Sequence, residues 1–343
     1  MKRMLFAVAA VVVALMMLAS CQNAALTSAK VYMQQSNWEK AKEQFELEVR
    51  ANPSNGDAHA YLAQCYVELG DFQKAGESFG QARAKVKETK KLEQIEGSQL
   101  QLAGEHVKRG NAQFGADKFM EAANEYRIAT QIYPEYRDAY KNRGVALLRA
   151  EAIDEAKEAW GTALSLSQRG DETWVQAHDV FAKLAMQDSS YADALAHTDS
   201  VLSVKPEDLE LLNLKAGLLD GLGRLDEALE IYKRILTLDP NNVDALFNLG
   251  VIYSKLGRIE EAEAAFKDLV AKVPGDKEAQ YNLGVMAMNL QRWEMARDAF
   301  QKVTELDPEN GQAWQNLGIC LLNLGDTKGG KAAFDKASLL GIQ

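Results

Sequence analysis

Histidines and cysteines are the side chains in this chain that could bind a metal ion or act as nucleophiles. The 343 residues include four histidines and three cysteines, all widely separated. No Cys-x-x-Cys, His-Glu-x-x-His, Gly-x-Ser-x-Gly or phosphate-loop pattern occurs, so no motif brings a metal ligand or a nucleophile to its partner. The sequence therefore offers no catalytic or metal site, and we expect a protein that is not an enzyme and uses no cofactor.

Carboxylates are the most abundant chemically active groups, but their arrangement does not suggest acid–base catalysis. Asp and Glu number 49 against 39 Lys and Arg, which gives a formal net charge of −10. They are spread along helix-forming stretches such as Glu260-Glu261-Ala262-Glu263, and no pair stands apart as an acid and a base. A nucleic-acid-binding protein needs a basic face, so the acidic balance argues against a nucleic-acid partner.

The first residues form an export signal that ends at a cysteine. Lys2 and Arg3 precede an apolar run over residues 4–18, and Ala19-Ser20-Cys21 follows. A basic start and an apolar core of this length are typical of a secretory signal and are short for a membrane span.

Leu18-Ala19-Ser20-Cys21 resembles the bacterial lipobox. The resemblance implies that residues 1–20 are a lipoprotein signal peptide, and that the new N-terminal residue, Cys21, carries acyl chains such as palmitate. Residue 22 is Gln rather than Asp, which resembles the default for sorting to the outer membrane, facing the periplasm. The alternatives are an ordinary signal peptide or an uncleaved anchor with an incidental cysteine.

A 34-residue pattern positions the remaining residues. If Val243 is position 1, apolar residues recur at helical spacing through position 11, and a second apolar face runs from position 20 to position 27. Small residues stand at positions 8 and 20, an aromatic at 24 and proline at 32; all six prolines of the chain fall at position 32. The windows are 22–55, 56–89, 103–136, 137–170, 175–208, 209–242, 243–276, 277–310 and 311–343.

This arrangement resembles the tetratricopeptide repeat. The resemblance implies an all-α fold, a right-handed α-solenoid of about nine tandem helix-turn-helix units over residues 22–343. The small residues let the two helices of a unit cross closely, the aromatic fills the space beside them, and proline ends the second helix.

The repeat explains the histidines and two of the cysteines. His59, His106 and His178 all fall at position 4, between the two helices, so we expect them to be core residues, with His197 alone. Cys65 and Cys320 fall at core position 10 and are expected to be buried free thiols.

Residues 90–102 form a helical insertion between the second and third windows. We expect the preceding helix to lengthen to about Glu96, with Gly97-Ser98 turning into the next helix. A basic cluster lies here and is either a solvated face or a contact for an acidic partner or lipid headgroups: Arg83, Lys85, Lys87, Lys90 and Lys91.

The family resemblance places positions 2, 5, 6, 9, 12 and 13 of the first helix on a concave face. In the last three repeats position 6 is Asn248, Asn282 and Asn316, which resembles the asparagine ladder of O-GlcNAc transferase. An amide both donates and accepts hydrogen bonds, so such a row suits a peptide backbone; alternatively, asparagine is simply frequent at this position. Apolar residues line the same face: Phe247, Val251, Tyr281, Val285, Met288, Ile319 and Leu322.

These features predict a lipid-anchored scaffold or adaptor of the bacterial envelope that binds a segment of another envelope protein in the concave groove. The alternative is a self-associating structural component of an envelope assembly or of pilus or exopolysaccharide export machinery. It would associate through the apolar residues of the last helix, which include Phe334, Ala337, Leu339 and Leu340.

Overall fold

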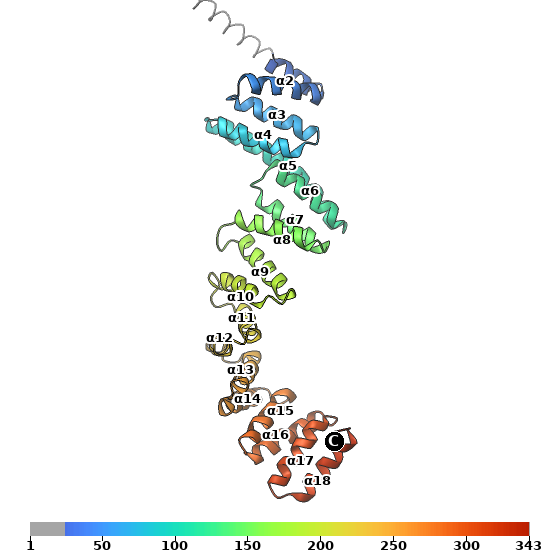
Figure 1. Ribbon diagram of the computed structural model, residues 1–343, viewed down its shortest axis with the longest axis vertical. Helices are drawn as coiled ribbons and strands as arrows, with labels where there is room; N and C mark the ends of the chain where they lie inside the picture. Colours follow the sequence, from blue (N-terminus) through green and yellow to red (C-terminus); the bar gives the residue numbers. More distant parts are fainter. Residues whose placement is uncertain (1–24, 343) are drawn as a thin grey trace, which may run out of the picture. The chain divides into compact units, whose positions relative to one another are not determined.

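The computed structural model describes residues 25–342, and this part of the chain contains helices and turns but no strand (Figure 1). The chain divides into two compact units, unit 1 up to Ala177 and unit 2 from His178 onward. Unit 1 starts with a helix over residues 25–34. It continues with α2 (Trp38–Ala51), α3 (Gly56–Glu68), α4 (Phe72–Lys85), α5 (Thr89–Gly115), α6 (Phe119–Ile132), α7 (Arg137–Arg149) and α8 (Ile153–Ser165).

Helix α9 (Glu172–Gln187) contains the division between the units. Unit 2 continues with α10 (Tyr191–Leu202), α11 (Leu209–Gly221), α12 (Leu225–Leu238), α13 (Val243–Lys255), α14 (Ile259–Lys272), α15 (Lys277–Asn289), α16 (Trp293–Leu306), α17 (Gly311–Asn323) and α18 (Thr327–Leu339). Within each unit, helix pairs stack on their neighbours as an α-solenoid, which confirms the expected fold class.

Local sequence signals set where the helices begin and turn. In unit 2 the first helix of each pair follows an Asp or Asn whose side chain accepts a hydrogen bond from the first turn, as Asn242 does from the Ala245 N–H at 2.9 Å. Such N-caps satisfy backbone donors that have no partner inside the helix. Gly257 ends the turn from α13 to α14 with φ of +72°, a backbone conformation that glycine adopts without strain.

In several pairs a glycine beneath an aromatic ring sets the crossing point of the two helices. A Cβ at Gly250 would lie 2.7 Å from the Phe266 ring, and one at Gly284 would lie 2.8 Å from the Phe300 ring. Both rings are essentially fully buried. The structure thus shows directly why positions 8 and 24 hold a small and a large residue.

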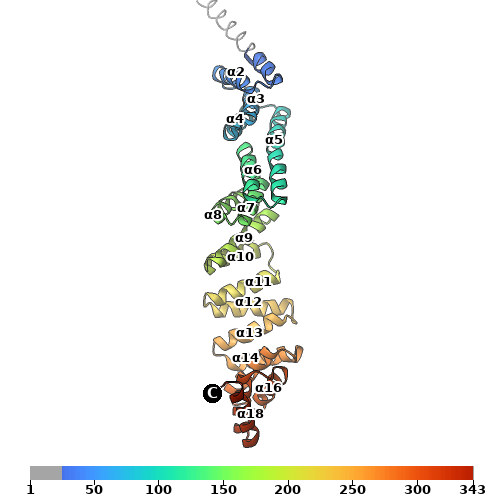
Figure 2. The same ribbon diagram turned by 90° about the vertical axis from the view of Figure 1, so that its right-hand side faces the viewer.

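The insertion over residues 90–102 is helical, but it belongs to the following helix, so the predicted connection was wrong. Helix α4 ends at Lys85, and the chain leaves the helical conformation before Thr89. Helix α5 then runs without interruption through Gly97 and Ser98 to Gly115 and stands out as the longest ribbon of unit 1 in Figure 2. Val86 packs against Gly56, the first residue of α3, and this contact holds the break in place.

The basic cluster beside the insertion is partly neutralised within the chain. Arg83 pairs with Glu135 at 2.8 Å, and Lys91 pairs with Asp57 at 3.1 Å. Lys85 donates to the Gln81 side-chain oxygen at 2.7 Å. Arg83 and Lys91 therefore contribute to the packing of unit 1, whereas Lys87 and Lys90 are exposed and form no ion pair within residues 25–342.

The outer face of α18 is polar. Its buried residues are Gly330, Ala333 and Ala337, and its exposed residues include Lys328, Lys331, Asp335 and Lys336. Phe334 and Leu340 are half-buried against α17, whereas Leu339 is 84% exposed. Of the apolar residues predicted to mediate association here, only Leu339 lies open.

Among residues 25–342, no helix combines the length and the apolar character needed to cross a bilayer.

Candidate partner-binding surface

The residues predicted to form the groove lie on α13, α15 and α17 of unit 2. All are half-buried except two: Asn316 is buried at 7% exposure, and Leu322 is exposed at 45%. Helix α13 carries Phe247, Asn248 and Val251; α15 carries Tyr281, Asn282, Val285 and Met288; and α17 carries Asn316, Ile319 and Leu322.

Two aromatic rings of this surface are held from below by core rings. Phe247 meets Phe266 edge to face with centroids 5.8 Å apart, and Tyr281 meets Phe300 in the same way at 5.5 Å. Edge-to-face contacts at these distances are favourable and restrict ring rotation. The half-exposed aromatics are therefore preorganised by the buried Phe266 and Phe300 rings on which they rest.

The three asparagines are not equivalent. Asn316 donates from Nδ2 to the Tyr281 hydroxyl oxygen at 3.2 Å and accepts at Oδ1 from Gln312 Nε2 at 3.5 Å. Its amide is thus engaged within the protein. Asn248 and Asn282 are half-buried and make no side-chain hydrogen bond to any residue in the described range 25–342. Of the three asparagines, Asn248 and Asn282 are therefore the ones whose amides are open to a ligand.

Two hollows adjoin along this surface. One is lined by Asn213, Val243, Asp244, Phe247, Asn248, Asp276 and Glu278. The other is lined by Lys277, Glu278, Tyr281, Asn282, Asp307, Asn310 and Gln312. Glu278 lines both, so we treat the two hollows and the predicted groove residues around them together as the unit 2 groove. Of the predicted residues, Phe247, Asn248, Tyr281 and Asn282 line the hollows, and the others lie outside their lining. Sequence reasoning missed Asp244 and Glu278, although both occupy position 2 on the expected concave face.

The charges of the unit 2 groove are unevenly paired. Lys277 Nζ lies 3.1 Å from Asp307 Oδ2, and the Asp276 carboxylate caps α15 by accepting from the Glu278 and Ala279 N–H groups. Asp244 and Glu278 are exposed and form no ion pair within the described part of the chain. The groove therefore presents unneutralised negative charge beside half-exposed aromatic rings.

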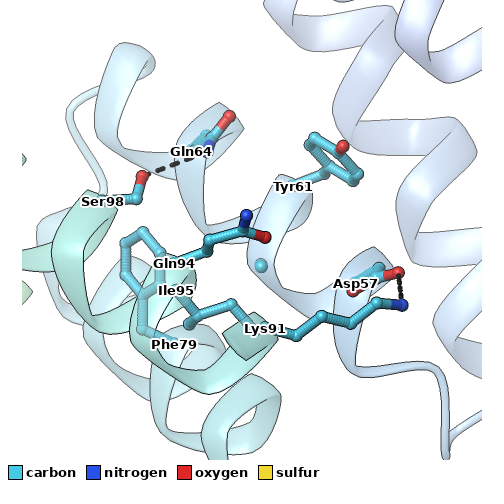
Figure 3. Close-up of a pocket in the computed structure, with 9 residues that line it drawn as sticks. Asp57, Tyr61, Gln64, Phe79, Lys91, Gln94, Ile95 and Ser98 are labelled. Carbon is cyan, nitrogen blue, oxygen red and sulfur yellow. Dashed lines mark hydrogen bonds and ion pairs between the residues drawn. The ribbon is translucent and has the colours of Figure 1, made fainter. Parts of the chain in front are cut away.

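The corresponding face of unit 1 carries a smaller hollow, between α3 and α5 (Figure 3). Lys91 and Asp57 pair at its mouth, and Gln64 Nε2 donates to Ser98 Oγ at 3.3 Å. The Tyr61 ring stacks with Phe45 at 5.5 Å and has Lys30 Nζ 4.7 Å from its centroid. Neighbouring residues of the same unit thus engage Asp57, Tyr61 and Gln64, whereas Gln94, which also lines the hollow, is exposed and makes no side-chain hydrogen bond within residues 25–342.

Histidines pair within repeats rather than gathering at a site. His106 Nδ1 lies 2.7 Å from Glu125 Oε2, and His178 Nδ1 lies 2.9 Å from His197 Nδ1. The expectation that His197 stands alone was therefore wrong: its helix faces the one that carries His178. His59 Nε2 contacts the Pro53 carbonyl oxygen at 3.2 Å. Between residues 25 and 342, no three metal-ligating side chains come together.

Two of the three cysteines lie in the described part of the chain, and the third lies outside it. Cys65 and Cys320 are buried free thiols, as predicted. Burial raises the pKa of the Cys65 thiol to about 12 and that of Cys320 to about 11, so neither is a reactive thiolate at neutral pH. Cys21, the proposed acylation site, lies in the part of the chain that the structure does not describe.

Comparison with known families identifies the repeats. One tetratricopeptide repeat family matches residues 26–85, 107–167 and 180–243, which together exceed half of the chain. The chain belongs to the tetratricopeptide repeat family. Further families of the same repeat match residues 221–287, 277–310 and 299–331, so the matches extend over most of both units.

Individual relatives are distant. The chain is 26% identical over 145 residues to the human protein O-mannosyl-transferase TMTC3 and 25% identical over 155 residues to its mouse counterpart. The matches cover 41% and 44% of this chain but only 16% of each relative. Among solved structures, a truncated MamA from Desulfovibrio magneticus RS-1 is 25% identical, with a TM-score of 0.46; the match covers 51% of this chain and 97% of the solved MamA chain.

Proposed function

We propose that this protein is a non-enzymatic adaptor that binds a segment of another protein in the unit 2 groove. Tetratricopeptide repeats form protein-interaction scaffolds, and this groove has the features of a binding surface. The observation that carries the proposal is the half-exposed pair Phe247 and Tyr281, each seated on a buried ring, beside the open amides of Asn248 and Asn282. Rigid aromatics and adaptable amides are suited to bind a peptide with little loss of side-chain entropy.

The proposal includes a lipid anchor in the bacterial envelope, at the outer membrane and facing the periplasm. It is supported by Lys2-Arg3, the apolar run and the Leu18-Ala19-Ser20-Cys21 sequence. Each buried methylene contributes about 0.8 kcal/mol, so two or three acyl chains on Cys21 hold a folded domain stably at a bilayer. Metabolic labelling with an alkyne-bearing fatty acid should mark the wild-type protein, whereas Cys21→Ser should lose both the label and membrane association. Equal membrane association of the two proteins contradicts the anchor.

The groove is tested by crosslinking and pull-down from membranes. The variant Phe247→Ser/Tyr281→Ser/Met288→Ser should lose an envelope protein that the wild type recovers. A matched control, Leu238→Ser/Leu306→Ser, removes exposed apolar residues of α12 and α16 outside the groove and should retain it. Retention of the partner by the groove variant contradicts the proposed site.

A second candidate is self-association as a structural component of an envelope assembly. The observation that favours it is Leu339, a large apolar side chain that is 84% exposed on α18. Multi-angle light scattering distinguishes the two proposals, since self-association predicts a mass above that of the monomer that returns to the monomer value in Leu339→Ser. A monomeric wild type excludes this candidate.

A further inference from the structure

We infer that the segment bound in the unit 2 groove is extended and carries basic side chains at every third position, with apolar side chains between them. This inference rests on the proposed function and adds the chemistry of the partner. It is argued from three properties of the groove, namely its unpaired carboxylates, its unpaired amides and the spacing of its helices.

The carboxylates form a row at the amino-terminal ends of the first helices, in which Asp244 and Glu278 line the groove and Glu210 lies outside its lining. Glu210, Asp244 and Glu278 stand at position 2 of the successive helices α11, α13 and α15. All three are exposed, and none forms an ion pair within the described residues. A carboxylate in the first turn is favourable to the helix dipole, which accounts for an acid at each site. The helix dipole does not explain why these carboxylates have no neighbouring cation. The equivalent carboxylate of unit 1, that of Asp57, forms an ion pair with Lys91.

An ion pair at the carboxyl ends of α11 and α13 leaves no net charge between its two residues. Lys255 Nζ lies 2.7 Å from both carboxylate oxygens of Asp220, so the charged residues at the carboxyl ends of α11 and α13 neutralise each other. The centre is occupied by Phe247, Tyr281 and the aliphatic residues beside them. A complementary ligand therefore presents positive charge to one edge and apolar groups to the centre.

The open amides favour an extended ligand over a helical one. Asn248 and Asn282 each offer a donor and an acceptor, and the backbone of an extended peptide has free N–H and C=O groups to meet them. The backbone groups of a helix are already paired with one another. An extended segment is therefore the occupant that uses these two amides.

The spacing of the helices sets the period of the ligand. The first helices of successive repeats lie side by side, since the Lys255–Asp220 ion pair joins α13 to α11 and the Asn316–Tyr281 hydrogen bond joins α17 to α15. Helices that pack side by side lie about 8–10 Å apart, and an extended chain rises about 3.3 Å per residue. Successive carboxylates of the row thus fall opposite every third residue of the segment. Basic residues at this interval would face Glu210, Asp244 and Glu278 in turn.

Fluorescence anisotropy with designed peptides tests the inference on the full-length protein in detergent micelles. The probe is a labelled peptide of four Lys-Val-Thr triplets, in which β-branched residues favour an extended backbone. Two comparison peptides replace every Lys by Glu, or keep the composition with all lysines at one end. The protein variant Asp244→Asn/Glu278→Gln removes charge without changing shape. Its control is Asp268→Asn/Glu294→Gln, which neutralises exposed acids of α14 and α16.

The spaced lysine peptide should bind most tightly, and the charge-neutral groove variant should bind it about tenfold more weakly at low salt. The difference should shrink as salt screens the exposed charges. The control variant should bind like the wild type. Equal binding of the lysine and glutamate peptides, or equal binding of the groove variant and wild type, overturns the charge inference. Equal binding of the spaced and grouped lysine peptides overturns the period. If no peptide binds, the inference fails, whereas the proposed groove function fails only if the Phe247→Ser/Tyr281→Ser/Met288→Ser variant retains the partner in the pull-down.

Discussion

The concave surfaces of the two units are built from the same repeat positions but differ in how completely their polar groups are paired. In unit 1, Asp57 has Lys91 as its counterion and Gln64 donates to Ser98. In unit 2, Asp244 and Glu278 have no counterion, and the amides of Asn248 and Asn282 have no partner among residues 25–342. Both hollows nevertheless rest on fully buried aromatic rings.

This difference separates the structural role of a repeat surface from its binding role. A polar group that is satisfied by its own unit gains nothing from a ligand, whereas an unsatisfied one is available without first breaking an internal contact. The insertion that extends α5 supplies both Lys91 and Ser98, so the same residues that interrupt the repeat period also complete the surface of unit 1. Unit 2 has no such insertion.

The largest expected effects concern what the two hollows share. Phe79 lies beneath the unit 1 hollow and Phe266 beneath the unit 2 groove, and both are essentially fully buried. Truncation of either to Ala should destabilise its unit by about 3–5 kcal/mol through lost burial and an added cavity. Hydrogen exchange resolved by peptide should show the loss in the unit that carries the substitution. A small effect at either site would mean that this ring does not support the surface above it.

The next largest expected difference between the units is in how their stability depends on pH. The same two repeat positions hold His106 with Glu125 in unit 1 and His178 with His197 in unit 2. Burial, and then the neighbouring His197, lowers the pKa of His178; burial also lowers the pKa of His197, although Asp193 opposes this. A histidine in the unfolded chain has a pKa of about 6.5. As the pH falls below this value, the unfolded chain therefore binds more protons than the folded chain does. The stabilisation is therefore complete above about pH 6.5 and is lost below it.

Thermal unfolding at about pH 7.5 and about pH 5.5 measures this loss. The wild type should melt several degrees lower at the acidic pH, and His178→Gln/His197→Gln should show a smaller difference between the two conditions. Other titratable and charged groups near the pair include Asp179 and Lys183 on α9, Asp193 and Asp199 on α10 and Lys215 on α11. An equal acid-induced loss in the variant would assign the effect to these groups instead of the histidines.

A matched pair of hydroxyl deletions sharpens the comparison. The Tyr281 hydroxyl accepts from Asn316, which is buried, whereas the Tyr61 hydroxyl makes no hydrogen bond within the described residues. Tyr281→Phe should cost about 1 kcal/mol because a buried amide loses its acceptor. Tyr61→Phe should be close to neutral. Urea unfolding of both variants measures the difference, and equal free energies of unfolding would show that Asn316 finds another acceptor.

The 34-residue period predicted the helix pairs because it specifies local contacts within each repeat. Gly250 beneath Phe266 is such a contact, and it follows from residue size at two positions. The break before α5 could not be predicted in this way, since it depends on Val86 packing against Gly56 at the start of another helix. Asn316 was assigned to an open ladder because the period aligns it with Asn248 and Asn282. Its engagement by Tyr281 crosses from position 5 of one repeat to position 6 of the next. The pairing of His178 with His197 has a sequence signal that was missed, since His106 and Glu125 occupy the same two positions.

The smallest expected effect on stability comes from the ion pair that distinguishes the two surfaces. Lys91 and Asp57 are both about half exposed, and such pairs contribute about 0–1 kcal/mol. Lys91→Gln should therefore leave the free energy of unfolding almost unchanged while freeing the carboxylate of Asp57. Binding of the spaced lysine peptide to unit 1 should nevertheless stay weak, because the Gln64 amide is engaged by Ser98 and the Tyr61 ring is stacked on Phe45, so the freed carboxylate has the exposed Gln94 amide beside it but no row of open amides. Anisotropy of this variant, compared with that of the Asp244→Asn/Glu278→Gln variant, measures the contribution of charge alone. A strong new site in unit 1 would show that a free carboxylate is sufficient for binding, and that the amides and aromatic rings of the unit 2 groove are dispensable.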